Sequence, residues 1–253
     1  MDRVKTGIKG LDDMLNGGFL PRSANLVEGA PGTGKTTLGM QFIYTGIVEY
    51  NEPGIIVTFE EFPQQYYRDA LNFGWDFRRL EEEGKLRVFM TSPEVTKADL
   101  ENVGGMIETL TGTMDARRIF VDSISHFERM TSDPLELRSI MFSFVNGLKR
   151  EGLTSILTKE SPALFGEGYR ADNMAGYVVD SYLLLRYVEM ESAIRRALLV
   201  LKMRGSDHDK GIREYEIGKS GLDVMTKFED REGIMSGTPR RMVDSFMQAF
   251  VRK

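Results

Sequence analysis

The sequence is poor in residues that support thiol and imidazole chemistry. Its 253 residues include no cysteine, one tryptophan and two histidines, His126 and His208. The lack of cysteine excludes disulfide bonds, thiolate zinc sites and cysteine nucleophiles. Two histidines are too few for most histidine-based metal sites, and we interpret His126, which adjoins Phe127, as a structural residue. The chemistry of the protein must come from carboxylates, hydroxyls, cations and backbone groups.

The sequence also lacks a long apolar run and an excess of positive charge. No run reaches the roughly 18 residues of a membrane helix, and the polar first ten residues do not resemble a signal peptide, so we expect a cytoplasmic protein. Lysine and arginine total 33 against 38 acidic residues, a net charge of −5. This balance argues against broad nucleic-acid affinity, although a local basic ring remains compatible with it.

Residues 25–37 contain the most informative motif of the chain. They fit the pattern G-x-x-x-x-G-K-[ST] with Gly29, Gly34, Lys35 and Thr36 in the required places. A short apolar strand leads into the loop, whose glycines, including Gly32, allow backbone N–H groups to surround an anion. The following helix adds its N-terminal dipole, the lysine reaches the phosphates, and the threonine hydroxyl can bind Mg²⁺. The motif predicts nucleotide binding.

Short apolar strands alternate with helices from about residue 20 to 160. We expect strands at residues 25–27, 55–59, 86–90, 117–122 and 155–158, and helices at residues 38–50, 63–73, 97–110 and 134–150. This alternation predicts an α/β fold with a mainly parallel twisted sheet flanked by helices. A ligand should lie beyond the carboxyl ends of the strands.

The pattern changes after residue 160. Residues 161–175 are polar and rich in glycine, and we interpret them as a mobile loop. Residues 177–187 and 195–203 are typical of an antiparallel hairpin, within a β-rich region that extends to residue 225. Residues 227–253 form a polar tail with a weak helical pattern. With no clear linker, we expect one domain over residues 1–253.

Acidic residues follow two of the expected strands. Glu60 and Glu61 come after the second strand, where a carboxylate can orient or deprotonate the water that attacks a γ-phosphate. Asp122 ends the fourth strand, as a Walker B aspartate does, and can hold Mg²⁺ opposite Thr36. The alternatives are acids that complement a helix N-terminus for the glutamates and a solvated strand end for Asp122.

The ordered set of motifs resembles the KaiC family of RecA-like P-loop ATPases. Besides the phosphate loop, the resemblance depends on five stretches, which are TGIKGLD (6–12), TFEE (58–61), FGWD (73–76), VDS (121–123) and LKMRGSDH (201–208). The match covers nearly the whole chain. It implies an ATP-hydrolysing, Mg²⁺-dependent homo-oligomer, typically a hexamer, in which a neighbouring subunit completes each site.

The resemblance also implies roles for individual residues. Glu60 would be the principal base and Glu61 its helper, while Thr36 and Asp122 would bind Mg²⁺. Residues around the motif lysine would bind the phosphates, namely Gly32, Thr33, Gly34, Lys35, Thr36 and Thr37. Asn72 would contact the adenine or ribose. Lys202 and Arg204 would reach the γ-phosphate bound by the neighbouring subunit, with Met203, Ser206 and His208 at the same interface. Without the resemblance, these cations could equally belong to a solvated edge strand.

The sequence departs from the clock autokinase of this family at the autophosphorylation positions. Where that enzyme carries adjacent serine and threonine, this chain has Gly176 and Tyr177. We therefore predict no Ser/Thr autophosphorylation of that type, although Ser181 and Tyr177 remain conceivable acceptors. The chain also has one copy of the domain where clock proteins have two, which favours a plain ATPase ring, with a partner protein that the sequence does not identify.

Two other functions remain open at the level of sequence. RecA-like recombinases and motors place a DNA-facing loop where this chain has residues 161–175. That loop has one basic residue, Arg170, against Glu167 and Asp172, whereas backbone binding normally takes several cations. The third possibility is an ATP-gated scaffold with little turnover, which the presence of Glu60 disfavours.

Overall fold

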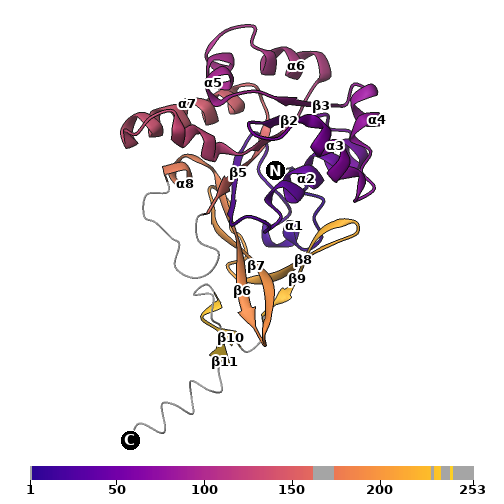
Figure 1. Cartoon of the computed structure of the whole chain (residues 1–253), viewed down its shortest axis with the longest axis vertical. Helices are drawn as coiled ribbons and strands as arrows, with labels where there is room; N and C mark the ends of the chain where they lie inside the picture. Colours follow the sequence, from indigo (N-terminus) through magenta and orange to yellow (C-terminus); the bar gives the residue numbers. More distant parts are fainter. Residues whose placement is uncertain (1, 162–173, 229–230, 235–239, 242–253) are drawn as a thin grey trace, which may run out of the picture.

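The computed structural model describes residues 2–161, 174–228, 231–234 and 240–241, and its largest element is a nine-stranded sheet (Figure 1). The strand order is β3-β2-β4-β5-β1-β6-β7-β8-β9. The strands are β1 (Ala24–Gly29), β2 (Gly54–Thr58), β3 (Leu86–Met90), β4 (Arg118–Asp122), β5 (Thr154–Glu160), β6 (Ser181–Met190), β7 (Ala193–Met203), β8 (Arg213–Gly218) and β9 (Gly221–Lys227). Two further short strands, β10 (Arg231–Glu232) and β11 (Arg240–Arg241), pair only with each other.

The sheet is parallel from β3 to β6 and antiparallel from β6 to β9. The predicted parallel sheet with an antiparallel C-terminal extension is therefore confirmed. The hairpin β6–β7 joins the main sheet because β6 also pairs with β1. Consequently β7 lies between β6 and β8, and the residues of β7 that pair with β8 are Ala197 and Leu198, so Lys202 lies beyond that pairing.

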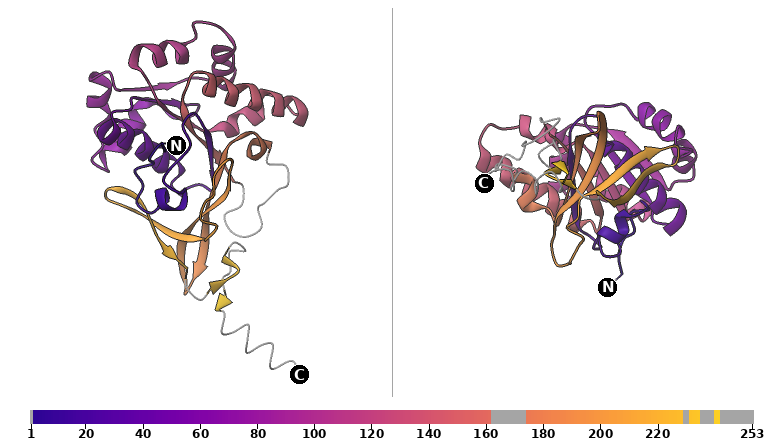
Figure 2. Two further views of the ribbon diagram at one scale, coloured as in Figure 1. Left: turned by 180° about the vertical axis from the view of Figure 1, so that it is seen from behind. Right: turned by 90° about the horizontal axis from the view of Figure 1, so that it is seen from below.

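Helices cover both faces of the sheet (Figure 2). They are α1 (Leu11–Met14), α2 (Lys35–Tyr50), α3 (Pro63–Leu71), α4 (Phe77–Glu82), α5 (Pro93–Glu101), α6 (Met106–Met114), the 3₁₀ helix η1 (Ile124–Arg129), α7 (Pro134–Arg150) and α8 (Met174–Val178). One hydrophobic cluster lies between the sheet and the first four helices, and the other lies beneath α5 to α8. Alternate residues of each central strand enter the two clusters, as the period of a strand requires.

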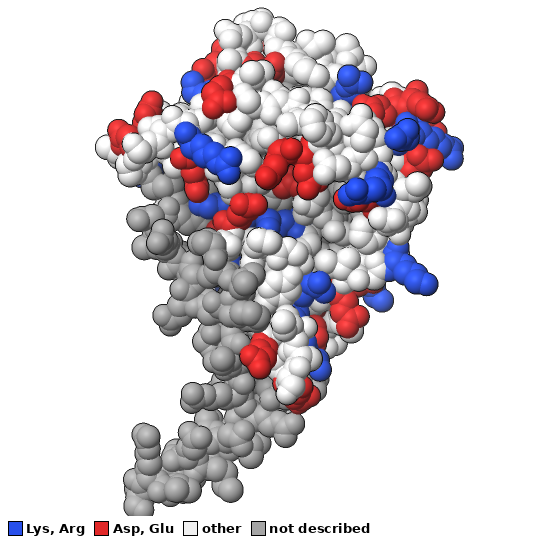
Figure 3. Space-filling model, in the orientation of Figure 1, with Lys and Arg blue, Asp and Glu red and all other residues white. Residues whose placement is uncertain are grey.

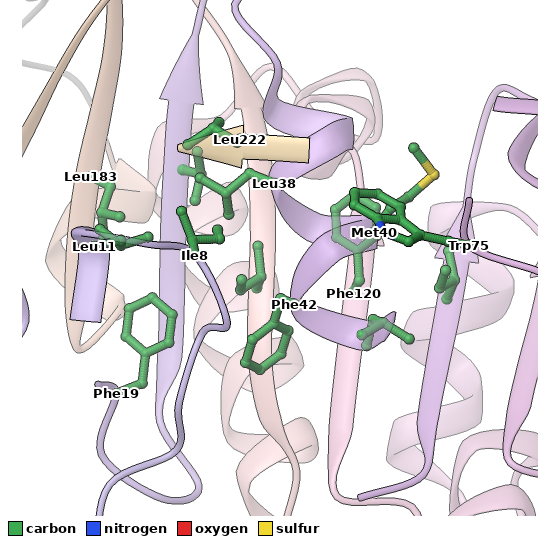
Figure 4. Close-up of a cluster of buried hydrophobic side chains, with 14 of the residues drawn as sticks. Ile8, Leu11, Phe19, Leu38, Met40, Phe42, Trp75, Phe120, Leu183 and Leu222 are labelled. Carbon is green, nitrogen blue, oxygen red and sulfur yellow. The ribbon is translucent and has the colours of Figure 1, made fainter. Parts of the chain in front are cut away.

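The first cluster fixes α2 behind the phosphate loop. Leu38 and Phe42 of α2 pack against Phe120 of β4 and against Phe19 and Leu222, which come from opposite ends of the chain (Figure 4). Gly39 lets α2 approach the sheet closely, because a Cβ there would lie 2.3 Å from the Phe120 ring. Each fully buried aliphatic or aromatic side chain of this kind stabilises the fold by about 1.5–3 kcal/mol relative to exposure.

Two expected elements differ from the structure. The helix expected over residues 97–110 is two helices, α5 and α6, because the chain breaks at Gly104 and Gly105 and the Asp99 carboxylate caps the second helix by accepting hydrogen bonds from the Met106 and Ile107 N–H groups. Residue 177, expected to begin a strand, lies in α8, and the strand starts at Ser181.

Several expectations concern residues that the structure does not describe. The expected mobile loop at 161–175 falls largely on residues 162–173, and the expected helical pattern of the tail falls on residues 242–253; both lie outside the described residues. Within the described part of the chain, no helix is both long and apolar enough to cross a membrane.

Candidate functional site

The phosphate loop joins β1 to α2 at the carboxyl end of the parallel strands. Gly32 and Gly34 adopt φ angles of 76° and 92°, a left-handed region in which a side chain is disfavoured. The Thr33 hydroxyl donates to the Ala30 carbonyl at 2.7 Å, and Lys35 Nζ donates to the same carbonyl at 3.1 Å. Burial lowers the pKa of Lys35, and the charges of nearby acids oppose that shift. The ammonium group of Lys35 is therefore partly buried and lies against the backbone of the loop.

The C-terminal strands hold this loop in place. The Tyr215 hydroxyl of β8 donates to the Thr33 carbonyl at 2.5 Å, and the Tyr187 hydroxyl of β6 donates to the Pro31 carbonyl at 3.3 Å. A Cβ on Gly34 would lie 2.5 Å from Ile217 of β8. The antiparallel extension therefore fixes the conformation of a motif that lies about 150 to 180 residues earlier in the chain.

Asp122 is the centre of a hydrogen-bond network at the end of β4. Its Oδ2 accepts from the Thr36 hydroxyl at 2.7 Å and from the Tyr66 hydroxyl of α3 at 3.0 Å. Its Oδ1 accepts from the Thr158 hydroxyl of β5. Burial, followed by the negative charge of Asp122, raises the pKa of Tyr66, so its hydroxyl stays protonated and donates. Three hydroxyls from separate elements orient this carboxylate.

The residues at this point fit a magnesium ion. Thr36 and Asp122 provide neighbouring oxygen donors, and Mg²⁺ is usually bound through one or two protein oxygens together with substrate phosphates and water. No cluster of three or more acidic or histidine side chains suited to a metal occurs among the described residues. A cation at Thr36 and Asp122 would therefore depend on nucleotide phosphates for much of its coordination.

Glu60 and Glu61 lie in the turn after β2, two and three residues beyond Thr58, the last residue of that strand. The register pairs Thr58 with Asp122, and the Thr58 hydroxyl accepts from the Glu61 N–H at 3.1 Å. Burial, followed by the charges of Asp122, Asp69 and Glu60, raises the pKa of Glu61. The Glu60 side chain is 69% exposed, and its Oε2 lies 3.5 Å from His126 Nε2. His126, interpreted as structural, thus contacts the predicted base.

Lys202 and Arg204 lie at the opposite edge of the sheet from the phosphate loop. Along the paired strands, Met203 of β7 is level with Ser181 of β6 and Asn25 of β1, whereas the phosphate loop begins at Gly29. Four residues of strand correspond to about 13 Å. We call the edge with residues 180 and 202–208 the amino edge. We call the edge with residues 29–36, 60–61 and 122 the carboxyl edge. The two sets cannot serve one nucleotide within one subunit.

The two predicted cations differ in their surroundings. Lys202 Nζ donates to the carbonyls of Gly176 at 3.0 Å and Val179 at 2.7 Å, and burial followed by the charge of Arg204 lowers its pKa. The Arg204 side chain is 59% exposed, and its guanidinium lies 3.9 Å from Asp180, a carboxylate that Lys149 already contacts at 2.6 Å. Lys202 is thus bound to its own subunit, whereas Arg204 faces solvent.

The remaining predicted contacts are spread over several places. Ser206 accepts from Arg3 at 2.7 Å, and His208 is half-buried with no hydrogen-bond partner for Nδ1 among the described residues. The Met203 side chain is buried in the core, so only its backbone can face a ligand. Asn72 ends α3 and is exposed. Of the conceivable phosphate acceptors, Ser181 is 2% exposed and Tyr177 is 62% exposed.

Sequence reasoning missed several residues that the fold brings to the carboxyl edge. They are Tyr66, His126, Thr158, Tyr187 and Tyr215. Thr158 ends the fifth expected strand, and the rule that ligands lie at carboxyl ends could have identified it. The other four contacts join segments that are far apart in sequence, so no local motif marks them.

Comparison with known proteins identifies relatives along most of the chain. The model of the KaiC ATPase family matches residues 4–229. Circadian clock protein KaiC3 of Synechocystis sp. is 38% identical over 237 residues, which are 94% of this chain and 46% of that protein. Circadian clock oscillator protein KaiC of Thermostichus vulcanus is 37% identical over 240 residues, which are 95% of this chain and 46% of that protein. The chain therefore spans about half the length of these relatives.

Proposed function

The chain belongs to the KaiC family of RecA-like ATPases, and from this premise we propose that it hydrolyses ATP at sites shared between two copies of itself. The observation that carries the proposal is the separation of its two functional edges. The phosphate loop, the acids and the candidate magnesium ligands share the carboxyl edge, while Arg204 lies exposed at the amino edge. A neighbour's amino edge would complete each site.

Binding of ATP depends on the phosphate loop. Backbone N–H groups at Gly32, Thr33 and Gly34 and at the start of α2, with Thr36 and Thr37, surround the phosphates, and Lys35 exchanges the Ala30 carbonyl for phosphate oxygens. Asn72 contacts the base or the ribose. Thr36 and Asp122 would hold Mg²⁺, which when bound would neutralise negative charge on the nucleotide phosphates.

Hydrolysis requires a water aimed at the γ-phosphate. Glu60 orients this water and accepts its proton, because its carboxylate is exposed at the carboxyl edge, in the turn that follows the pairing of Thr58 with Asp122. Glu61, whose pKa is raised, supports the same proton transfer. Arg204 of the neighbour stabilises charge that develops on the γ-phosphate, as an arginine finger does. Lys202 fixes the end of α8 and adds positive potential beside Arg204, and Met203, Ser206 and His208 shape that interface.

Contact between unlike edges predicts a ring. An interface that joins the carboxyl edge of one subunit to the amino edge of the next is heterologous, and repeated head-to-tail contacts close into a ring when the rotation permits. The family resemblance favours six subunits. On the face shown in Figure 3, acidic and basic side chains are interspersed without a broad basic area. We therefore propose a regulatory ATPase ring rather than a nucleic-acid motor.

The test is ATP hydrolysis per subunit as a function of protein concentration, with Mg²⁺ and without nucleic acid. Specific activity should rise with concentration and then saturate as light scattering detects assembly. Constant specific activity across a range in which the assembly dissociates would contradict a shared site. Absence of hydrolysis at every concentration would indicate the ATP-gated scaffold, and stimulation by single-stranded DNA at physiological salt would favour the motor.

A further inference from the structure

We propose that His126 is a positioning residue that holds Glu60 in place for attack on ATP. The inference rests on the proposed function, because it concerns the residue proposed there as the base. The contact that carries it joins His126 Nε2 to Glu60 Oε2 at 3.5 Å. The two residues are far apart in the sequence, since His126 follows β4 and Glu60 follows β2.

The His126 ring is held firmly by its surroundings. It belongs to η1, whose Ile124 and Phe127 are buried in the second hydrophobic cluster. The ring meets Phe59 edge-on with centroids 6.1 Å apart, and only 13% of the side chain is exposed. Phe59 in turn packs on Phe127, whose ring lies 4.8 Å from that of Phe144. A chain of edge-on and tilted aromatic contacts, from Phe59 after β2 to η1 and α7, therefore fixes the position of the imidazole.

Glu60, in contrast, has little else to fix its side chain. It is 69% exposed, and the Thr58 hydroxyl that anchors this turn contacts backbone N–H groups and not the Glu60 carboxylate. Within the part of the chain that the structure describes, His126 is the one cationic or hydrogen-bonding side chain at ion-pair distance from that carboxylate. The imidazole contacts Oε2, and no hydrogen bond or ion pair joins Oε1 to the described residues, so we expect this oxygen to meet the water.

The pairing of a fixed imidazole with a mobile carboxylate explains what His126 contributes. A general base acts only when its oxygen lies within hydrogen-bond reach of the proton that it removes, and a misplacement of about 1 Å can reduce the rate by about a hundredfold. An exposed glutamate samples many rotamers. A contact to one carboxylate oxygen selects the rotamers that direct the other oxygen along the carboxyl edge, towards the end of β4.

The alternative is that His126 serves only to pack against Phe59. This role predicts that the loss of the ring affects folding and nucleotide binding as much as turnover. Positioning predicts an effect on kcat with little change in the KM for ATP, and it predicts that the effect requires Glu60. A double-mutant cycle separates the two roles.

The experiment compares wild type, His126→Ala, His126→Gln, Glu60→Gln and the double variant Glu60→Gln/His126→Ala in single-turnover and steady-state ATP hydrolysis. His126→Ala should lower kcat by about tenfold and change the KM by less than about twofold. The His126→Gln amide nitrogen reaches about as far as Nε2 and can donate to the carboxylate, so this variant should recover most of the rate. In the Glu60→Gln background, loss of His126 should have no further effect.

A matched control is Glu128→Gln, which alters an exposed acid of η1 that pairs with Lys159 at 2.7 Å; its kcat should match the wild type. An equal loss from His126→Ala with and without Glu60 would overturn the inference, as would an unchanged kcat. If His126→Ala does not fold, the comparison of His126→Gln with His126→Leu decides, since leucine fills the space without donating. Full activity of Glu60→Gln would overturn the proposed role of Glu60 together with this inference. An inactive Glu60→Gln beside a fully active His126→Ala would overturn this inference alone.

Discussion

The carboxyl edge and the amino edge of the sheet are built in different ways. At the carboxyl edge, three hydroxyl groups hold the Asp122 carboxylate, and two tyrosine hydroxyls hold backbone carbonyls of the phosphate loop. All five partners are neutral and belong to the same subunit. At the amino edge, Arg204 is mostly exposed and its nearest acid is shared with Lys149. One edge is pre-organised, and the other presents a cation outward.

This difference shows how a site can be divided between copies of a chain. Pre-organised donors stabilise developing charge without reorganisation, which suits the edge that binds ATP. In the isolated subunit, water solvates and screens the charge of an exposed arginine. Its interaction with a phosphate becomes strong only when assembly removes that water.

The first prediction concerns the cation of the carboxyl edge. Lys35→Ala should reduce ATP hydrolysis by about a thousandfold, because it removes a charge that contacts the phosphates in the ground state and the transition state. Hydrolysis and the binding of a fluorescent ATP analogue are the measurements. Lys97→Ala, which removes a lysine that pairs with Glu101 on α5 at 2.9 Å, is the control and should retain activity. Near-normal turnover by the Lys35→Ala variant would show that the phosphates do not bind at Lys35.

The second prediction tests whether the amino edge acts on a neighbour. Arg204→Ala should reduce hydrolysis by about a hundredfold through loss of transition-state stabilisation. Mixing it with Lys35→Ala should restore part of the activity, because about a quarter of the interfaces in a random 1:1 ring would combine an intact phosphate loop with an intact arginine. Each variant mixed with itself is the control. No recovery in verified mixed rings would show that both residues act within one subunit.

The third prediction concerns the network on Asp122. Tyr66→Phe removes one of three hydroxyls that orient the carboxylate, and it should raise the Mg²⁺ concentration for half-maximal hydrolysis by about tenfold. Tyr67→Phe is the matched control, since that hydroxyl contacts Glu81 and not Asp122. The measurement is activity against Mg²⁺ at saturating ATP. If activity depended on Mg²⁺ concentration in the same way for both variants, Tyr66 would have no role in orienting Asp122 for the metal.

The fourth prediction concerns stability at the start of β8 and is the smallest. Asp209 contacts Arg213 at 2.6 Å and Lys227 at 3.4 Å, and its hydrogen bond with Arg213 is the largest cause that lowers its pKa to about 2. A lowered pKa stabilises the fold above the unfolded value of about 3.9, and this contribution is lost as the pH falls through about 2.

Asp209→Asn should therefore lower the free energy of unfolding by about 1 kcal/mol at neutral pH, after allowance for solvent screening. The difference from wild type should narrow as the pH falls below about 4, as followed by urea unfolding at several pH values. Asp223→Asn, on an exposed position of β9, should show no such narrowing. A pH-independent difference for Asp209→Asn would mean that the ion pairs contribute little.

Much of the carboxyl edge could be predicted from sequence because its signals are local. Gly29 to Thr36 form one continuous motif, and the acids at positions 60, 61 and 122 each follow an apolar run that is visible in the sequence. Parallel strands bring their carboxyl ends to one edge, so these short signals combine without further information. The family resemblance added Lys202 and Arg204, whose charge pattern alone did not distinguish a site from a solvated strand.

What the sequence could not supply are contacts between distant segments. Even the nearby break between α5 and α6 depends on Asp99 reaching the N–H groups of Met106 and Ile107, a side-chain contact that helical periodicity does not reveal. The ties from Tyr187 and Tyr215 to the phosphate loop depend on β6 pairing with β1. Hydrogen bonds of this kind are decided by register, and register has no local signature in the chain.

The sequence by itself determined that the chain binds a nucleotide on an α/β sheet, because strand, loop and helix are specified by neighbouring residues through backbone conformation and hydrophobic period. Only the tertiary structure decided which side chains share an edge. Strand order and register place Met203 level with Asn25 and Leu198 level with Gly29. The two functional edges are therefore separated by the length of a strand, and the sites can be completed only by a second copy if the proposed function holds.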